Sequence, residues 1–433
     1  MNPLSFWPRR TLTLGTYGLP FLNLPFRIPI KEAKTHFHYI SVSGSGKSRA
    51  LAALYLELLK HGMAATLIDP HGDLTKLVLS HLVTNGTYNN PQAFKDILYL
   101  DLPTAERQQR FLAWNVLNQP YDDHTTARSI LEALRRAWPS LDQGNAPNFE
   151  NIVLAGTFVL IQHGLPLPML HDLLTNKPWR QRLLRTVTDD QVISFFRDRF
   201  DHWAKDQPML IESSLRRIFL LSFSPSLRYS LSQKENLLNF RHLIDGNKSL
   251  IINLALGDAD ARRLLGCLLT VSAETAALSR SDLGSAQRLN SHHLILDEFS
   301  EFTAQSEESL SRILSLCRKY GLYLVMAHQT WSQASERLRG ALQNVGVEAA
   351  FRLGRADAEH SATIMGRVNP LRVKHEVSDE RAVEKTHPVF SSLPEQWESW
   401  AQSLQDLKPR EAFIKKSSGK VAKIRSIKMV PIN

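Results

Sequence analysis

Cysteine is scarce in this sequence, and the two that occur form no metal-binding pattern. Among the 433 residues, Cys267 and Cys317 lie far apart, and neither belongs to a Cys-x-x-Cys motif or a Cys/His cluster. Structural zinc is therefore not expected, and both side chains are predicted to be small buried residues in helices. Such low cysteine use is typical of proteins that work in a reducing cytoplasm.

Long apolar runs are also missing. The longest, from Ile152 to Ile161, is much shorter than the roughly 20 residues that a membrane-spanning helix needs. The N-terminus, MNPLSFWPRRTLTLG, contains no apolar core of signal-peptide length. We therefore expect a soluble, cytoplasmic protein without a membrane span, which would reach the inner membrane only through a partner.

The rest of the composition is that of a globular protein with a basic excess. Hydrophobic residues make up 43% of the chain and charged residues 22%, a balance that permits a large core. The 52 Lys and Arg residues outnumber the 42 Asp and Glu residues, which gives a formal charge of +10. This excess favours anionic partners such as nucleic acid or an acidic membrane surface. Charge alone leaves open a basic protein that binds no nucleic acid.

Hydrophobic periodicity divides the chain into four zones. Residues 1–115 and 246–365 alternate short strands with helices, which predicts right-handed crossovers and a mostly parallel sheet. Residues 120–245 have helical spacing throughout, which predicts an all-helical insertion. Residues 366–433 predict a linker, a helix and a basic hairpin that turns near residues 417–419. The expected fold class is α/β, with a P-loop core split by the helical zone.

The segment SVSGSGKS at residues 41–48 follows a predicted strand and opens a predicted helix, as a phosphate-binding loop requires. Its glycines let backbone N–H groups approach phosphates, and the helix N-terminus adds positive charge. Lys47 is expected at the β and γ phosphates and Ser48 at Mg²⁺, although Ser41 stands where the motif has glycine. The predicted ligands are ATP and Mg²⁺, and the predicted binding residues are Ser43, Gly44, Ser45, Gly46, Lys47, Ser48 and Arg49.

Two further strands are predicted to end at this site. LILDEF at residues 294–299 reads as a buried strand followed by carboxylates, so Asp297 is predicted to hold the metal with Ser48, and Glu298 to act as general base. Gln329, at the end of LYLVMAHQ, is predicted to sense the γ-phosphate. The 250 residues between Lys47 and Asp297 (297 − 47) exceed what a compact core needs, and the helical insertion accounts for them.

The order of the motifs resembles a known group of motors. SGSGKS is followed by IDPHGD at 68–73, LILDEF, CRKYGLYLVMAHQT at 317–330 and NVGVEAAFRLG at 344–354. This series resembles the HerA/FtsK superfamily, in particular the TraG/TraD-like coupling ATPases of conjugation and type IV secretion. The resemblance spans residues 30–365, and it implies a RecA-like core that assembles as a hexameric ring, threads DNA through its channel and hydrolyses ATP between subunits.

The same resemblance assigns further residues and partners. Arg318 matches the arginine finger that reaches a neighbouring subunit's nucleotide, with Arg352 and Arg355 as second choices. Asp69 and Asp73 belong to the family's DPHGD loop, whose role stays open. The implied partners are DNA and a nuclease, a relaxase or a secretion channel. The sequence departs from the family at Ser41 and lacks the N-terminal transmembrane helices of true secretion coupling proteins, which leaves open a cytosolic role in DNA processing, transfer or defence.

Three functions remain in competition. The favoured one is a DNA-translocating ring ATPase. The alternative is a nucleotide-gated adaptor that recruits a nuclease or a secretion substrate without threading DNA, and a protein-translocating ATPase is the third. The presence of Glu298 and Arg318 favours turnover over nucleotide sensing.

Other residues have a structural and a functional interpretation. The histidines at 36, 38, 292 and 293 suggest metal by their pairing, but without neighbouring carboxylates they are expected to be structural. Trp179 and Trp203 are expected in the helical core rather than on DNA. The tail cations are expected either at DNA phosphates or on a solvated edge hairpin; they are Lys415, Lys416, Lys420, Lys423, Arg425 and Lys428.

Overall fold

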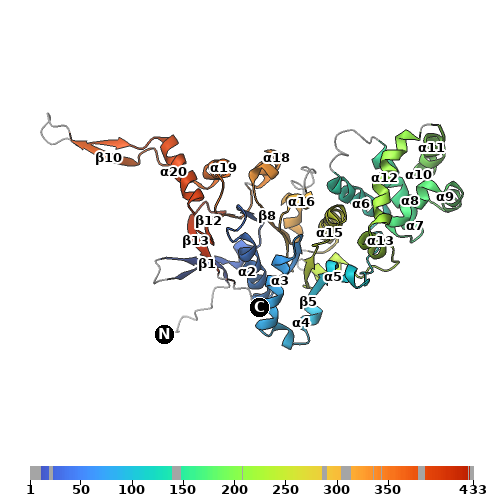
Figure 1. Ribbon diagram of the computed structural model, residues 1–433, viewed down its shortest axis with the longest axis horizontal. Helices are drawn as coiled ribbons and strands as arrows, with labels where there is room; N and C mark the ends of the chain where they lie inside the picture. Colours follow the sequence, from blue (N-terminus) through green and yellow to red (C-terminus); the bar gives the residue numbers. More distant parts are fainter. Residues whose placement is uncertain are drawn as a thin grey trace. The chain divides into compact units, whose positions relative to one another are not determined.

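The computed structural model describes residues 11–18, 23–138, 148–206, 208–284, 290–303, 314–334, 336–342, 344–378, 386–427 and 429. The chain forms two compact units. The first combines the residues up to His61 with those from Val325 onward, and the second extends from Gly62 to Leu324. Figure 1 labels their helices and strands.

The first unit is built on a mixed sheet with the strand order β2-β1-β13-β12-β9-β3-β8. β3 pairs in parallel with both β8 and β9, whereas β12 pairs antiparallel with β9 and β13, and β1 pairs antiparallel with β13 and β2. The strands are β1 (Thr11–Tyr17), β2 (Leu24–Pro29), β3 (Phe37–Ile40), β8 (Leu322–His328), β9 (Val347–Ala350), β12 (Glu411–Lys416) and β13 (Val421–Ser426). The basic hairpin β12–β13 therefore lies inside the sheet, so the expectation of an edge hairpin is wrong.

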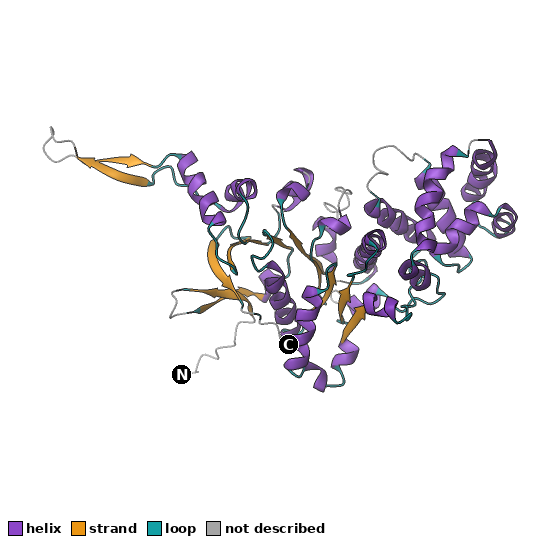
Figure 2. Ribbon diagram, viewed as in Figure 1, coloured by secondary structure: helices purple, strands orange, loops and turns teal. Residues whose placement is uncertain are grey.

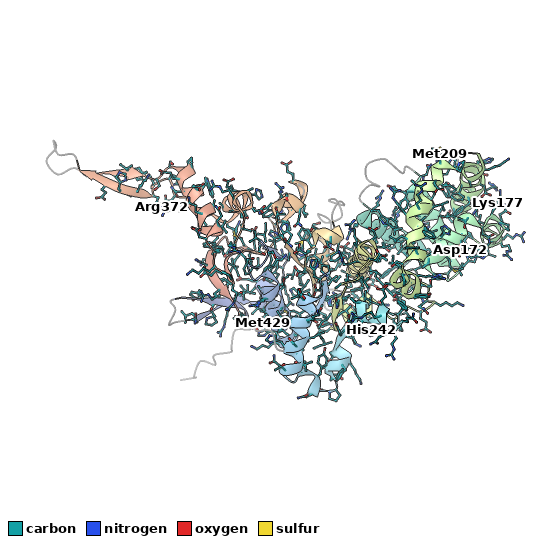
Figure 3. All side chains as sticks on the ribbon, viewed as in Figure 1. Asp172, Lys177, Met209, His242, Arg372 and Met429 are labelled. Atoms are coloured by element: carbon teal, nitrogen blue, oxygen red, sulfur yellow. The ribbon has the colours of Figure 1, made fainter. Side chains whose placement is uncertain are left out.

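Helices of the first unit follow its strands. The helix that opens after the glycine-rich loop, α2, is rich in alanine and leucine and buries most of its length. The helices are α1 (Ile30–Ala33), α2 (Lys47–Lys60), α18 (Glu336–Leu342), α19 (Arg355–Met365) and α20 (Leu393–Gln405), with a 3-10 turn at Trp331–Gln333. A separate two-stranded ribbon begins just after Arg372 (Figure 3) and consists of β10 (Val373–Ser378) and β11 (Thr386–Phe390).

The second unit contains four parallel strands in the order β7-β4-β6-β5. β4, β6 and β7 are buried at every position, which explains why apolar residues fill their centres, because both faces of a parallel sheet are covered. The strands are β4 (Ala64–Asp69), β5 (Ile97–Asp101), β6 (Ser249–Asn253) and β7 (His292–Leu296). The helices and turns beside them are α3 (Asp73–Thr84), α4 (Ala93–Asp96), α5 (Leu102–Arg107), α15 (Ala259–Ser279), α16 (Ser300–Thr303) and the 3-10 turn Cys317–Tyr320.

The described residues between β5 and β6 contain helices and no strand, as Figure 2 shows. Both the α/β fold class and its helical insertion are thus confirmed. The helices are α6 (Asp123–Ala137), α7 (Phe149–Gln162), α8 (Leu170–Thr175), α9 (Lys177–Leu184), α10 (Asp190–Ser194), a π-helical turn (Phe195–Phe200), α11 (Asp201–Asp206), α12 (Met209–Phe223), α13 (Pro225–Leu231) and α14 (Phe240–Asp245).

A buried ion pair joins this insertion to the core of the second unit. Arg136 of α6 is fully buried, and its two terminal nitrogens donate to the carboxylate of Glu274 on α15 at 2.8 and 2.7 Å, while Nε donates to Glu132 at 2.9 Å. A bidentate geometry that also satisfies Nε offsets much of the desolvation cost. The pair therefore fixes the register of α6 against α15.

Candidate nucleotide site

The glycine-rich loop adopts the conformation that its sequence predicts. β3 ends at Ile40 and α2 begins at Lys47. Between them Gly44 and Gly46 have φ values of +74° and +104°, where L side chains are strained. No heavy atom lies within 4 Å of the position that a Gly44 Cβ would occupy, so a ligand can approach this backbone closely.

The N-terminus of α2 is open to an anion. Its N-cap residue, Gly46, provides no side-chain hydrogen bond, and the first N–H groups of a helix lack partners within the helix. Lys47, the first helical residue, is only 7% exposed, Ser48 is half-buried, and Ser43 and Arg49 are exposed. Backbone N–H groups at a helix N-terminus, the helix dipole and a buried ammonium group together fit a polyphosphate.

Backbone contacts from distant segments hold this loop. Ser41 N–H donates to the carbonyl of His328 at 3.3 Å, and Val42 N–H donates to that of Arg352 at 3.0 Å. Within the loop, Ser45 Oγ donates to the carbonyl of Val42 at 2.6 Å. The loop is therefore fastened to the ends of β8 and β9.

A fourth contact comes from the turn before β12 and was missed by sequence reasoning. Arg410 N–H donates to the carbonyl of Ser45 at 2.8 Å, and Arg410 has a φ of +73°. Burial and then the positive charges of Arg425 and Arg49 lower the pKa of the Arg410 guanidinium. The C-terminal segment thus supports the phosphate loop, and no local motif around Arg410 signals this.

Gln329 follows β8 directly, and its side chain is exposed. Ile40 at the end of β3 is the register partner of His328. Because neighbouring parallel strands end at the same edge of a sheet, Gln329 lies beside the start of the phosphate loop, where the sequence predicts a sensor. The Gln329 backbone N–H donates to Gln333 Oε1 at 3.1 Å, which anchors the turn.

In the second unit, Asp297 and Glu298 directly follow β7 and are 4% and 7% exposed. Asp297 N–H donates to the carbonyl of Ile68, which continues the pairing with β4. Glu298 has a φ of +52°, a left-handed conformation that costs a residue with a side chain roughly 1–2 kcal/mol. Backbone strain of this kind persists only where the surrounding structure holds it, and it is frequent at functional sites. Hydroxyl and carboxylate oxygens, as in Ser48 and Asp297, are the donors that Mg²⁺ prefers.

The DPHGD loop has a structural explanation. Asp69 Oδ1 accepts a hydrogen bond from His71 N–H at 3.0 Å, and Oδ2 accepts one from Thr75 N–H at 2.8 Å. Gly72, at the N-cap of α3, has a φ of +84°. Asp69 thereby fixes the turn from β4 into α3, and Asp73 lies exposed in the first turn of that helix.

Arg318 is exposed in the 3-10 turn before β8, and no carboxylate of the described residues forms an ion pair with it. Glu307 and Glu308 lie outside the described residues. The turn itself is firmly held, since the buried Arg280 donates through Nη1 to the carbonyls of Tyr320 at 2.6 Å and Asn290 at 3.2 Å.

The second-choice arginines are less suited to reach another subunit. Arg355 donates to both oxygens of Glu398 at 2.5 and 2.6 Å and to Glu359 at 2.6 Å. Arg352 is exposed, and its backbone carbonyl holds the phosphate loop. Arg318 thus stays the predicted finger.

The paired histidines have hydrogen-bond partners. His292 Nε2 lies 2.8 Å from Thr66 Oγ1, and burial lowers the pKa of His292 to about 3. His293 packs on Tyr323. The sequence-based expectation that these histidines lack carboxylates is wrong for His38, because Glu348 lies against it at 3.4 Å. His36 is buried, and the described residues contain no group of three or more possible metal ligands.

Most of the tail cations have partners within the chain. Lys423 and Arg425 lie 3.1 and 3.5 Å from Glu411, and Lys415 and Lys416 donate to the carbonyls of Ile364 and Arg27. Lys420 is exposed, and Lys428 lies outside the described residues. Phosphate binding by the tail therefore stays a prediction that Lys420 supports best.

Aromatic side chains of the insertion divide into two groups. Trp179 and Trp203 are half-buried, and Trp203 packs against Phe195 and Arg199. Phe219 and Phe223, which the sequence did not single out, are 49% and 70% exposed on α12, the helix that begins at Met209 (Figure 3). None of the helices in the described part of the chain combines the length and hydrophobicity needed to cross a bilayer.

Residues 291–369, which include Asp297, Glu298, Arg318 and Gln329, match a family described as the TraM recognition site of TraD and TraG. The resemblance to TraG/TraD-like coupling ATPases is confirmed. No curated protein matches the chain in sequence.

Solved structures agree with this fold. The bacterial conjugative coupling protein TrwBdeltaN70 is 17% identical with a TM-score of 0.57, over 94% of this chain and 88% of its own. The plasmid coupling protein TrwB in complex with ADP and Mg²⁺ gives the same values. VirB4 of Thermoanaerobacter pseudethanolicus is 14% identical with a TM-score of 0.55, over 96% of each chain. The α/β fold of this chain is thus the fold of TrwB and VirB4.

Proposed function

We propose that this protein is an ATP-dependent motor that moves DNA. The observation that carries the proposal is the glycine-rich loop at the N-terminus of α2, where Gly44 and Gly46 adopt positive φ beside the buried Lys47 and so form a cradle for a polyphosphate. The strained Glu298 behind Asp297 supports hydrolysis rather than binding alone, because a sensor of nucleotide does not require a base.

Each residue has a role in this proposal. Lys47 and the loop N–H groups bind the phosphates, and Gln329 senses the γ-phosphate. Ser48 and Asp297 would hold Mg²⁺, which neutralises phosphate charge when bound. Glu298 accepts the proton of the attacking water.

DNA is the partner that the charge and the family likeness favour. The chain carries an excess of ten positive charges, and the name of TrwB describes a conjugative coupling protein. We extend the proposal to a homo-hexameric ring in which Arg318 acts on the nucleotide of the adjacent subunit. The match to a TraM recognition site supports a further protein partner at residues 291–369, and a relaxase, a nuclease or a secretion channel would fit a motor of the cytoplasm.

ATP hydrolysis measured with and without single- and double-stranded DNA tests the proposal. We expect Mg²⁺-dependent turnover that DNA stimulates, and displacement of a third strand from a triplex as the motor moves. Turnover without strand displacement would favour the adaptor, and a protein that binds no nucleotide would overturn the proposal.

A further inference from the structure

A chain of three buried titratable side chains joins neighbouring parallel strands beside the phosphate loop. Glu348 lies on β9, His38 on β3 and His328 at the end of β8. His38 Nδ1 is 3.4 Å from Glu348 Oε1, and His38 Nε2 is 2.6 Å from His328 Nε2. Both histidines are fully buried, and Glu348 is 4% exposed.

The distance between the His38 and His328 rings allows only one proton between their Nε2 atoms. A nitrogen–nitrogen contact of 2.6 Å requires an N–H on one ring and a lone pair on the other. The carboxylate of Glu348 favours a hydrogen on His38 Nδ1. One proton therefore lies between the two Nε2 atoms, and a second would place two donors face to face and break the contact.

The groups around the pair oppose a second proton. Burial, followed by the charges of His38 and Lys47, lowers the pKa of His328 well below its ordinary value. Arg339 of α18 adds to this effect, and a hydrogen bond with the Thr330 backbone opposes it. The single-proton arrangement is consequently the stable one at neutral pH.

The three side chains are connected to the phosphate loop through His328. The carbonyl of His328 accepts the Ser41 N–H, and the next residue is the predicted sensor Gln329. The Trp331 ring packs against His38 and His328, with centroids 5.0 and 5.4 Å away, and its Nε1 donates to Ser361 Oγ at 2.8 Å. The side chain and backbone of His328 are thus both fixed, and a shift of this residue would move Ser41 and Gln329.

We propose that Glu348, His38 and His328 are positioning residues for ATP hydrolysis that hold the end of β8 so that Gln329 stays aligned with the phosphate loop. This inference rests on the proposed ATPase function. A purely structural role would affect stability and leave turnover unchanged, which separates the two interpretations.

Substitutions in the full-length chain test this role. His38→Leu and His328→Leu should each lower kcat by roughly 10- to 10²-fold, because small misplacements of reacting groups have effects of this size. The Kd for ADP should stay within about twofold, since the glycines and Lys47 are intact. The double variant should be no slower than the single ones, because both changes remove the same contact.

His292→Leu is the matched control. His292 is also a buried histidine with a hydrogen bond, to Thr66, but it lies at the first position of β7. We expect a lower thermal stability and an unchanged kcat. Glu348→Gln keeps the volume of the side chain and should also lower kcat. It tests the role of the three side chains if the leucine variants do not fold.

The pH dependence of ATP turnover separates a positioning role from a purely structural one, which a stability measurement cannot do. Acidification adds the second proton and breaks the contact, so turnover by the unsubstituted protein should fall as pH falls, and its advantage over His328→Leu should shrink. Unchanged kcat in the variants, additive losses or parallel pH profiles would overturn this inference while leaving the ATPase in place. An unsubstituted protein that binds ATP without hydrolysing it would overturn the proposed function and this role together.

Discussion

The phosphate loop of the first unit and the end of β7 in the second unit both use the left-handed backbone region, for opposite reasons. In the first unit, Gly44 and Gly46 adopt positive φ at little cost, since glycine has no Cβ. In the second unit, Glu298 adopts positive φ although it has a side chain. The loop is predicted to bind phosphates through its backbone N–H groups, whereas the residue after Asp297 is predicted to act through its carboxylate. We therefore expect the loop to govern nucleotide binding and the Glu298 carboxylate to govern turnover.

The largest effect is expected at Arg318. Arg318→Ala should lower ATP turnover by about 10³-fold or more while nucleotide binding persists, because a finger neutralises charge that develops during phosphoryl transfer. Mixing Arg318→Ala with Lys47→Ala subunits should restore part of the activity if the arginine acts across an interface. Steady-state ATPase assays with subunit exchange verified by labelled protein measure this. A fully active Arg318→Ala protein would show that Arg318 is not the arginine finger.

The next effect concerns the base. Glu298→Gln retains the volume and most hydrogen bonding of the side chain but cannot accept a proton. We expect turnover to fall by roughly 10²-fold, with an unchanged Kd for ATP in equilibrium binding. If Glu298→Gln weakened ATP binding but left turnover normal, Glu298 would govern binding rather than hydrolysis.

A smaller effect is expected in the phosphate loop. Gly44→Ala has room for its methyl group, so its only cost is the left-handed backbone, about 1–2 kcal/mol. That cost should weaken nucleotide binding about tenfold. Gly354→Ala is the control, because Gly354 also has open space around it but a φ of −71°. Equal affinities in the two variants would show that the loop does not depend on its conformation.

The smallest effect is a gain in stability. Glu298→Gly relieves the strain at the end of β7 and should raise the free energy of unfolding by about 1 kcal/mol, although turnover is lost. Chemical denaturation measures it, compared with Glu298→Ala, which also removes the carboxylate but keeps the strained backbone. A less stable Glu298→Gly protein would mean that contacts of the Glu298 side chain outweigh its backbone strain.

Local motifs made part of this site predictable. The cradle around Lys47 and the carboxylates after β7 depend on residues adjacent in sequence and on strand patterns that end beside them. The contacts of Arg410 with Ser45 and of Glu348 with His38 depend on strands that meet only in the folded sheet. The strain at Glu298 was hidden for another reason, because a non-glycine residue carries no signal of positive φ.

The position of β12 and β13 within the sheet has a consequence for biosynthesis. β1 and β2 join the rest of their sheet through β13, and β3 pairs with β8 and β9, which all follow the second unit in the chain. A ribosome therefore releases the residues of the second unit before the first unit can close. The glycine-rich loop is synthesised before the second unit, yet its contact with Arg410 can form only after the second unit has been synthesised. Nascent chains that end before Arg410 consequently lack the contact that holds the Ser45 carbonyl.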